Sequence, residues 1–304
     1  MNGLTLSGSY YREWGERIIA GKYSRYQHRI AVGLVGEGSD CYGFDDEISM
    51  DHDWGPGFCL WLTSADYEII GKDLQNDYDT LPSEFLGYRR ITSRFGTERV
   101  GVQTIDSFFM RHIGLPHAPE TAMQWLYLPE ERLSVCTNGR VFEDQMGEFS
   151  RIRNDLLAFY PEDIRMWKMA ARCRTCAQAG QYNYPRSLRR GERFAAQFAE
   201  TQFCADIISL VFLLNRCYTP FYKWRHRAVR ELPILGQFIY QKIIGLMDSR
   251  HFPTKINLIE EISAAVIAEL RHQDLSDAAG DFLLDHGACI QQCIQDSTIR
   301  SRLM

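Results

Sequence analysis

Three features that this sequence lacks limit what the protein can be. Its longest apolar stretch, Ile207 to Leu214, is far shorter than the roughly 20 residues that cross a bilayer as a helix. The N-terminus lacks the basic and then apolar layout of a secretory signal peptide. There is no excess of basic residues, because the formal net charge is −5. We therefore expect a cytoplasmic protein that contacts no membrane and for which nucleic acid is not the expected partner.

The sequence also lacks the two ligand pairs at matching spacing that a zinc site needs. The nine cysteines are an odd number scattered along the chain, so without a secretory signal we expect reduced thiols rather than a disulfide framework. Cys173 and Cys176 have a spacing that zinc sites use, but no second pair at matching spacing follows them. Both lie in a helical pattern, where such spacings arise by chance, so a metal or redox role is the less favoured interpretation.

Two halves of different character are present in the 304 residues, a length that suits two domains. Up to about residue 145, strand and helix signals are mixed. Beyond it, helical periodicity continues to the end, with prolines at the boundaries between helices. The sequence therefore predicts an α+β protein, with a mixed sheet and helices in residues 1–145 and a helical bundle in residues 146–304.

Strands in the first half are predicted at 29–35, 51–62 and 99–105, after a helix over 7–20. A short hairpin is predicted around Asn138-Gly139, with residues 133–135 and 140–142 as its arms. Residues 188–217 give the strongest helical pattern, with Phe194 and Phe198 at the start of an apolar stripe. The other helices of the second half are predicted at 148–159, 162–179, 234–248, 256–272 and 276–296.

The most informative motif follows the first predicted strand. Gly36-Glu37-Gly38-Ser39-Asp40 closes that strand, and Asp51-His52-Asp53 follows after a short spacer. On a strand over 51–62, Asp51 and Asp53 point to the same face. Two carboxylates held so close favour a cation between them, and Mg²⁺ suits oxygen ligands and nucleotide phosphates. The Gly-Ser turn leaves backbone N–H groups for a phosphate. The alternative is that both aspartates line an exposed strand or turn.

This combination resembles the nucleotidyltransferase superfamily of DNA polymerase beta and kanamycin nucleotidyltransferase, in which a Gly-Ser pair precedes Asp-x-Asp at similar spacing. The wider context, from Gly36 through Pro56, looks like a bacterial branch known only as a domain of unknown function. The resemblance implies that a nucleoside monophosphate passes from an NTP, foremost ATP, to a hydroxyl of a small-molecule or protein acceptor, with release of pyrophosphate. It implies that Gly38 and Ser39 bind the nucleotide. Asp51 and Asp53 would then be catalytic ligands of two Mg²⁺ ions.

A third carboxylate on a neighbouring strand completes the metal site in this superfamily. Asp106, which closes the predicted strand 99–105, is the candidate catalytic and metal-binding residue, and Glu98 is the second choice. Strict alternation puts Asp106 on the side of Val100 and Val102, which look core-facing. Asp106 therefore reaches the metals only if the strand ends or bulges near Thr104. Otherwise it is an N-cap of the next helix.

Positive charge for a triphosphate has more than one candidate source. In the aromatic segment 218–224, Lys223 is the candidate nucleotide-binding residue, because its ammonium meets a phosphate as a point charge. A packed helix end explains the same segment equally well. Clusters such as Arg89, Arg90 and Arg94 are further candidates, although solvated faces are the commoner explanation.

A second functional hypothesis accompanies the enzyme. Without a third carboxylate, the chain would be a catalytically silent scaffold that binds nucleotide or a protein partner, as an antitoxin does. Such a scaffold would bind an NTP without releasing pyrophosphate, and this difference separates the two hypotheses.

Overall fold

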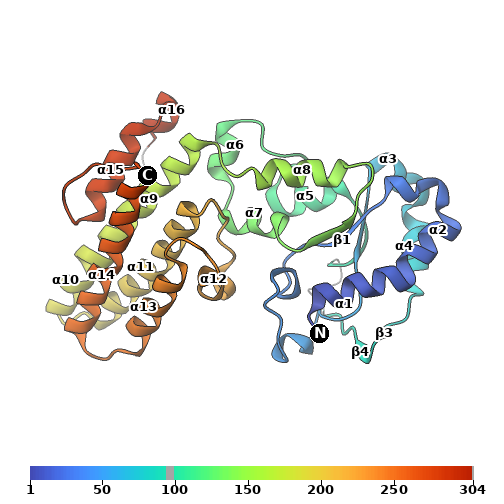
Figure 1. The fold of residues 1–304 in the computed structure, drawn as a ribbon, viewed down its shortest axis with the longest axis horizontal. Coiled ribbons are helices and arrows are strands. Elements are labelled where there is room, and N and C mark those ends of the chain that lie inside the picture. Colours follow the sequence, from blue (N-terminus) through green and yellow to red (C-terminus); the bar gives the residue numbers. More distant parts are fainter. Residues whose placement is uncertain (94–98, 303–304) are drawn as a thin grey trace. The chain divides into compact units, whose positions relative to one another are not determined.

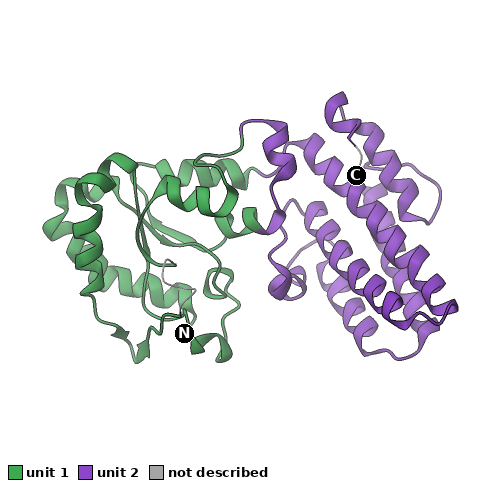
Figure 2. Ribbon diagram, turned by 180° about the vertical axis from the view of Figure 1, so that it is seen from behind, with its two compact units in different colours: residues 1–119, 132–158 green, residues 120–131, 159–304 purple. Residues whose placement is uncertain are grey.

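The computed structural model describes residues 1–93 and 99–302, which divide into two compact units (Figures 1 and 2). Unit 1 comprises residues 1–119 and 132–158, and unit 2 comprises residues 120–131 and 159–304. The predicted α+β class is confirmed, since unit 1 contains the sheets and unit 2 is helical. The division differs from the predicted boundary at 145. Residues 146–158 stay with the sheet because Phe149 stacks on Trp61 of a central strand, with ring centroids 3.9 Å apart.

Unit 1 is built around a mixed four-stranded sheet in the order β5-β2-β1-β6. Its strands are β1 (Ala31–Leu34), β2 (Cys59–Leu62), β5 (Gly101–Thr104) and β6 (Arg140–Glu143). β1 runs antiparallel to both β2 and β6, whereas β2 and β5 run parallel, with Cys59 opposite Gly101. The ends of β2 and β5 therefore point the same way, and the end of β1 lies beside the start of β2.

Helices cover both faces of this sheet, which explains why every residue of β1 and β2 is buried. Val32 and Leu60 face a core that includes Tyr11, Ile19 and Leu74 of the helices on one side. Trp61 faces the other way, where it meets Phe108 and Phe149. Strands buried on both faces read as continuous apolar runs rather than alternating ones. The helical segments of unit 1 are α1 (Gly3–Tyr10), a π-helix (Tyr11–Gly15), α2 (Glu16–Lys22), α3 (Ser64–Asp66), a second π-helix (Tyr67–Gly71), α4 (Lys72–Asp79), α5 (Ile105–Ile113), α7 (Glu130–Thr137) and α8 (Glu148–Leu157).

Two expected elements of unit 1 differ in the structure. The predicted hairpin around Asn138-Gly139 is wrong, because residues 133–135 belong to helix α7 and β6 pairs with β1 instead. The N-terminal helix is longer than predicted and runs without a break from α1 through the π-helix to the end of α2. Short 3₁₀ segments at Ser24–Arg29, Asp40–Tyr42 and Ile48–Asp51, and a small second sheet of β3 (Glu84–Phe85) and β4 (Tyr88–Arg89), complete the unit.

Unit 2 consists of helices α6 (Ala122–Tyr127), α9 (Glu162–Cys176) continued by a π-helix (Ala177–Asn183), α10 (Tyr184–Arg189), α11 (Arg193–Leu214), α12 (Tyr222–Val229), α13 (Gly236–Asp248), α14 (Phe252–His272), α15 (Leu283–Cys293) and α16 (Ser297–Arg300). By length and composition α11 could cross a membrane, but 72% of its apolar window is buried inside the unit, as in many core helices. The predicted apolar stripe is wrong at its start. Phe194 and Phe198 are 85% and 64% exposed, and burial becomes continuous only from Phe203 onward apart from half-buried Ala205.

Candidate active site at the end of strand β1

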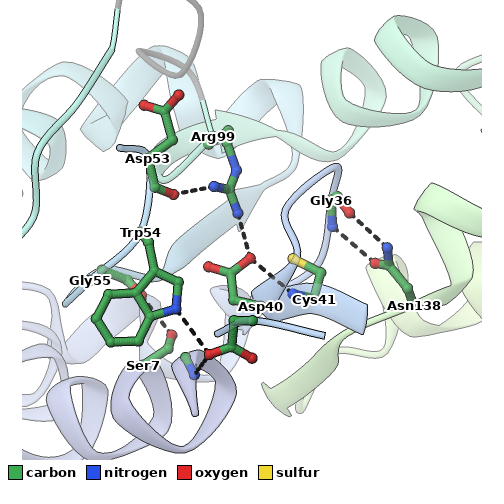
Figure 3. Close-up of polar contacts among 12 residues, drawn as sticks. Ser7, Gly36, Asp40, Cys41, Asp53, Trp54, Gly55, Arg99 and Asn138 are labelled. Carbon is green, nitrogen blue, oxygen red and sulfur yellow. Dashed lines mark hydrogen bonds and ion pairs between the residues drawn. The ribbon is translucent and has the colours of Figure 1, made fainter. Parts of the chain in front are cut away.

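A tightly held turn follows β1. The Asn138 side chain accepts a hydrogen bond from the Gly36 N–H (3.1 Å) and donates one to the Gly36 carbonyl (2.6 Å), as Figure 3 shows. The Gly139 N–H donates to the carbonyl of Cys41 (2.8 Å). Gly36 has φ +150° and Gly139 has φ +63°, a range that glycine adopts without steric cost. The chain between α7 and β6 thus fixes the turn from both sides.

Gly38 and Ser39 lie in this turn with their backbone N–H groups unused. Among the residues that the structure describes, neither N–H donates a hydrogen bond, whereas the Ser39 carbonyl accepts from Tyr42 and Phe44. A side chain at Gly38 would collide with the side-chain ends of Arg99 and Asp40, so any larger residue requires their ion pair to shift. Free N–H groups in a fixed turn form the kind of concavity that binds anions. The geometry agrees with the predicted nucleotide-binding role of Gly38 and Ser39 but does not test it.

An ion pair between Asp40 and Arg99 closes one side of the turn. Arg99 Nη2 lies 2.6 Å from Asp40 Oδ1, and the Asp40 side chain is only 2% exposed. Arg99 Nη1 also donates to the main-chain carbonyl of Asp53 (Figure 3). Burial lowers the pKa of Arg99, but the Asp40 carboxylate outweighs it and raises that pKa above the usual value. No local pattern indicates this pair, because its members are 59 positions apart.

Asp53 does not lie on a strand, so the prediction that it shares a strand face with Asp51 is wrong. Its φ is +54° and that of Gly55 is +120°, and neither angle is compatible with extended backbone. The Asp53 carboxylate accepts hydrogen bonds from the N–H (2.7 Å) and hydroxyl (2.5 Å) of Ser93 and points away from Arg99 (Figure 3). Burial opposes ionisation, yet these bonds and the Arg99 charge lower the pKa of Asp53. Asp53 is therefore an ionised acceptor at the start of the segment leading to β2.

Asp51 ends a 3₁₀ turn and projects into solvent. Its side chain is 63% exposed and lies 2.6 Å from Nδ1 of His52. Asp51 and Asp53 thus have different partners, and the structure records no ligand arrangement that joins them.

Asp106 lies at the opposite end of the sheet from the turn, so its predicted place in a common site is wrong. It sits in the first turn of α5, after β5, and accepts a hydrogen bond from the Ser64 hydroxyl (2.9 Å), which follows β2. Because β2 and β5 are parallel, residues after them are separated from residues before them by about 13 Å of strand. The helix is capped by Thr104, whose hydroxyl accepts from the Ser107 N–H. Glu98 and Arg94 lie outside the described residues.

The expected centre with two Mg²⁺ ions and three carboxylates does not fit the described donors. Within residues 1–93 and 99–302 there is no group of three or more His, Cys, Asp or Glu side chains that could hold a metal ion. Two residues before β5, the Arg99 side chain reaches the turn and pairs with Asp40. Among the described residues two guanidinium groups pair with carboxylates of the turn, Arg99 with Asp40 and Arg132 with Glu37.

Lys223 belongs to unit 2. It lies in the first turn of α12, where its ammonium is 5.0 Å from the centre of the Trp224 ring. Its predicted phosphate contact stays a prediction.

A buried charged network in unit 2 was missed by the sequence reasoning. Glu130, 6% exposed, accepts hydrogen bonds from Ser209 (2.6 Å), Thr219 (2.8 Å) and Arg172 (3.2 Å). Burial alone would raise the pKa of Glu130, but the charges of Arg172 and Lys168 lower it overall. These partners lie 42 to 89 positions from Glu130, so no local pattern could have grouped them. The network ties Glu130, the first residue of α7 and part of unit 2, to α9 and α11.

The comparisons with known proteins give two findings. Residues 125–225, less than half of the chain, match the family described as a domain of unknown function (DUF4037). The match includes Glu130 and its partners but none of the residues from Gly36 to Asp53. The crystal structure of a nucleotidyltransferase-like protein from Exiguobacterium sibiricum 255-15 is similar over 96% of this chain and 81% of that one, at 13% identity and a TM-score of 0.40.

At this level of likeness the structural neighbour supports no statement about activity. No curated protein matches the chain. The finding for residues 125–225 agrees with the expected branch of unknown function, whereas the particular relationship to kanamycin nucleotidyltransferase stays a prediction.

Proposed function

We propose that this chain binds a nucleoside triphosphate at the turn after β1 and transfers its nucleotidyl group to a hydroxyl of a small-molecule or protein acceptor. The observation that carries the proposal is the convergence of the Gly38-Ser39 turn and the Asp53 segment at one edge of the sheet, where Arg99 bonds to both sides. Unused N–H groups, a guanidinium and an ionised aspartate there suit a phosphate chain and its counter-ion.

In the proposed reaction the acceptor hydroxyl attacks the α-phosphorus of the NTP. A new P–O bond forms as the hydroxyl loses its proton to solvent, the bond to the β-phosphate oxygen breaks, and pyrophosphate leaves. The N–H groups of Gly38 and Ser39 hold the phosphates in position. Arg99 lies where it can offset the negative charge that collects on the leaving group, which is an electrostatic contribution to catalysis.

Mg²⁺ accompanies the nucleotide in this proposal. A Mg²⁺ ion bound with phosphates commonly takes only one or two protein carboxylates, so Asp51 and Asp53 are the residues that would hold one ion. The ion would supply charge neutralisation. No step depends on a second ion or on Asp106.

Calorimetric titration of each NTP into the protein, first with Mg²⁺ and then with EDTA, tests binding. We expect Mg²⁺-dependent binding of one NTP and its loss in the Asp51→Asn/Asp53→Asn double variant. Asp106→Asn is the matched control, because this exposed aspartate lies at the far end of the sheet and its loss should leave the affinity unchanged. Unchanged binding in the double variant would contradict the proposed role of both aspartates.

A second candidate function is a nucleotide-binding scaffold without transferase activity, the antitoxin-like alternative. The observation in its favour is that, among residues 1–93 and 99–302, no group of three or more His, Cys, Asp or Glu side chains could hold a metal ion. Pyrophosphate release separates the two. Release that requires an NTP and an acceptor supports transfer, whereas tight NTP binding with no release across a panel of acceptors favours the scaffold.

A further inference from the structure

We infer that Arg90 and Arg99 together form the subsite that recognises the terminal phosphates of the nucleotide. This inference rests on the proposed function for the identity of the ligand. It goes further by naming the residues that bind the phosphate chain. The first observation that supports it is the buried guanidinium group of Arg90.

In the part of the chain that the structure describes, the Arg90 guanidinium makes one hydrogen bond. Its Nη1 donates to the Gly55 carbonyl at 3.3 Å, while Nε and Nη2 are buried and have no hydrogen-bond partner. Within residues 1–93 and 99–302, no carboxylate forms an ion pair with Arg90. Burying an ionised group without a partner is costly, so such an arrangement calls for an explanation beyond stability.

The two arginines hold the same short piece of chain. Arg99 binds the carbonyl of Asp53 and Arg90 binds that of Gly55, two residues further on. The Arg99 charge acts on Arg90, so the two guanidinium groups lie near each other. Burial lowers the pKa of Arg90, and the nearby charge of Arg99 lowers it further. Among the described residues Asp40 forms an ion pair with Arg99 and not with Arg90, although its charge and Tyr78 offset part of the lowering of the Arg90 pKa.

The Gly55-Pro56-Gly57 segment is shaped to admit Arg90. A Cβ atom at Gly57 would lie 2.8 Å from Arg90 Nη1, and one at Gly55 would lie 2.9 Å from Arg90 Cα. Both glycines are therefore needed for Arg90 to reach its place. The same edge of the sheet carries the Gly38-Ser39 turn, against which Arg99 packs.

An anion with several phosphate groups suits this arrangement. The Arg99 side chain is 18% exposed, so it presents the contact surface, while Arg90 contributes its charge from behind. Guanidinium groups bind phosphate through paired, charge-assisted hydrogen bonds, and the free N–H groups of the turn add to them. A second positive charge close to a phosphate and partly shielded from water strengthens binding by about 10- to 100-fold.

The probe is inorganic tripolyphosphate, titrated calorimetrically without nucleoside or Mg²⁺. We expect Arg90→Met to bind it at least about tenfold more weakly than the wild type, Arg90→Lys to keep most of the affinity, and Arg89→Met to bind normally. Arg89 is the matched control, because it is the adjacent arginine but is exposed on β4. Arg90→Met should unfold at the same temperature or a higher one, because it removes an unpaired buried charge and keeps the apolar stem.

Failure of this inference and failure of the proposed function give different results. Wild-type affinity in Arg90→Met, or no binding of tripolyphosphate to the wild type, overturns the inference even if an NTP is bound. A drop in affinity that comes with a lowered unfolding temperature also overturns it, because Arg90 would then be structural. Arg90-dependent binding of tripolyphosphate without binding of any NTP leaves the anion subsite in place and overturns the proposed function.

Discussion

The Asp40–Arg99 ion pair makes a sharp prediction about stability. Asp40→Asn keeps the shape of the side chain but removes the buried carboxylate, which leaves the Arg99 guanidinium without a counter-charge. Breaking a buried ion pair from one side typically costs about 3–5 kcal/mol. Since Arg99 is 18% exposed and an Asn oxygen can still accept a hydrogen bond, we expect the low end, about 3 kcal/mol. For a unit of roughly 150 residues this lowers the unfolding temperature by about 6–12 °C.

Thermal unfolding followed by circular dichroism measures this change. Asp106→Asn serves as the reference, because an exposed carboxylate with one hydroxyl partner should change stability by less than about 0.5 kcal/mol. The double variant Asp40→Asn/Arg99→Met should recover much of the loss, because the unpaired cation is gone. An Asp40→Asn protein that unfolds within about 2 °C of the wild type would refute the buried ion pair on which the site is built.

Three further predictions concern other parts of the chain. Burial lowers the pKa of His112 to about 4 from the usual 6.5, so between these pH values the unfolded chain binds more protons than the folded one. The free energy of unfolding therefore falls as the pH falls from about 6.5 to about 4, by at most roughly 3 kcal/mol. Urea unfolding at pH 7 and pH 4.5 should show this fall in the wild type and a smaller one in His112→Leu. An equal fall in both proteins would contradict the assignment of the pH dependence to His112. Gly38→Ala should lower both the unfolding temperature and NTP affinity, because Arg99 and Asp40 must move, while Gly21→Ala, with open space around it in α2, should unfold at the same temperature or higher. Glu130→Ala leaves Arg172 and Lys168 without their shared carboxylate and should destabilise unit 2 by about 3 kcal/mol in urea unfolding, and a change below about 1 kcal/mol would show that the network is dispensable.

Local sequence patterns predicted the helices and strands whose conformation depends on residues close by in the sequence. The helices of unit 2 were found because their apolar residues recur with helical period, and β1 and the core of β2 were found as short apolar runs. The same reasoning failed at Leu133 to Val135, which are apolar enough for a strand but are buried as part of α7. It also failed at Phe194 and Phe198, since periodicity gives the face of a helix but not where its neighbours end.

The residues of the predicted nucleotide site also differ in how well the sequence predicted their backbone conformation. Gly38 and Ser39 were identified from sequence because a glycine turn after a strand has a local signature, and the structure places them at the end of β1 as expected. Asp51 and Asp53 were identified as a pair, but their backbone was assigned to a strand that begins only at Cys59. The positive φ of Asp53 depends on contacts with Ile91, Ser93 and Arg99, which lie about 40 positions away.

What the sequence determined by itself is therefore the α+β class, most helices and the glycine turn, because short-range sterics and periodic burial specify them. Only the tertiary structure decided which charges meet. It placed Asp106 at the far end of the sheet, brought Arg99 to Asp40 across 59 residues, and buried Arg90 with no ion pair among the described residues. Such pairings depend on strand order and direction, here β2 parallel to β5, and on the free energy of burying charge. Neither is encoded in the spacing of residues along the chain.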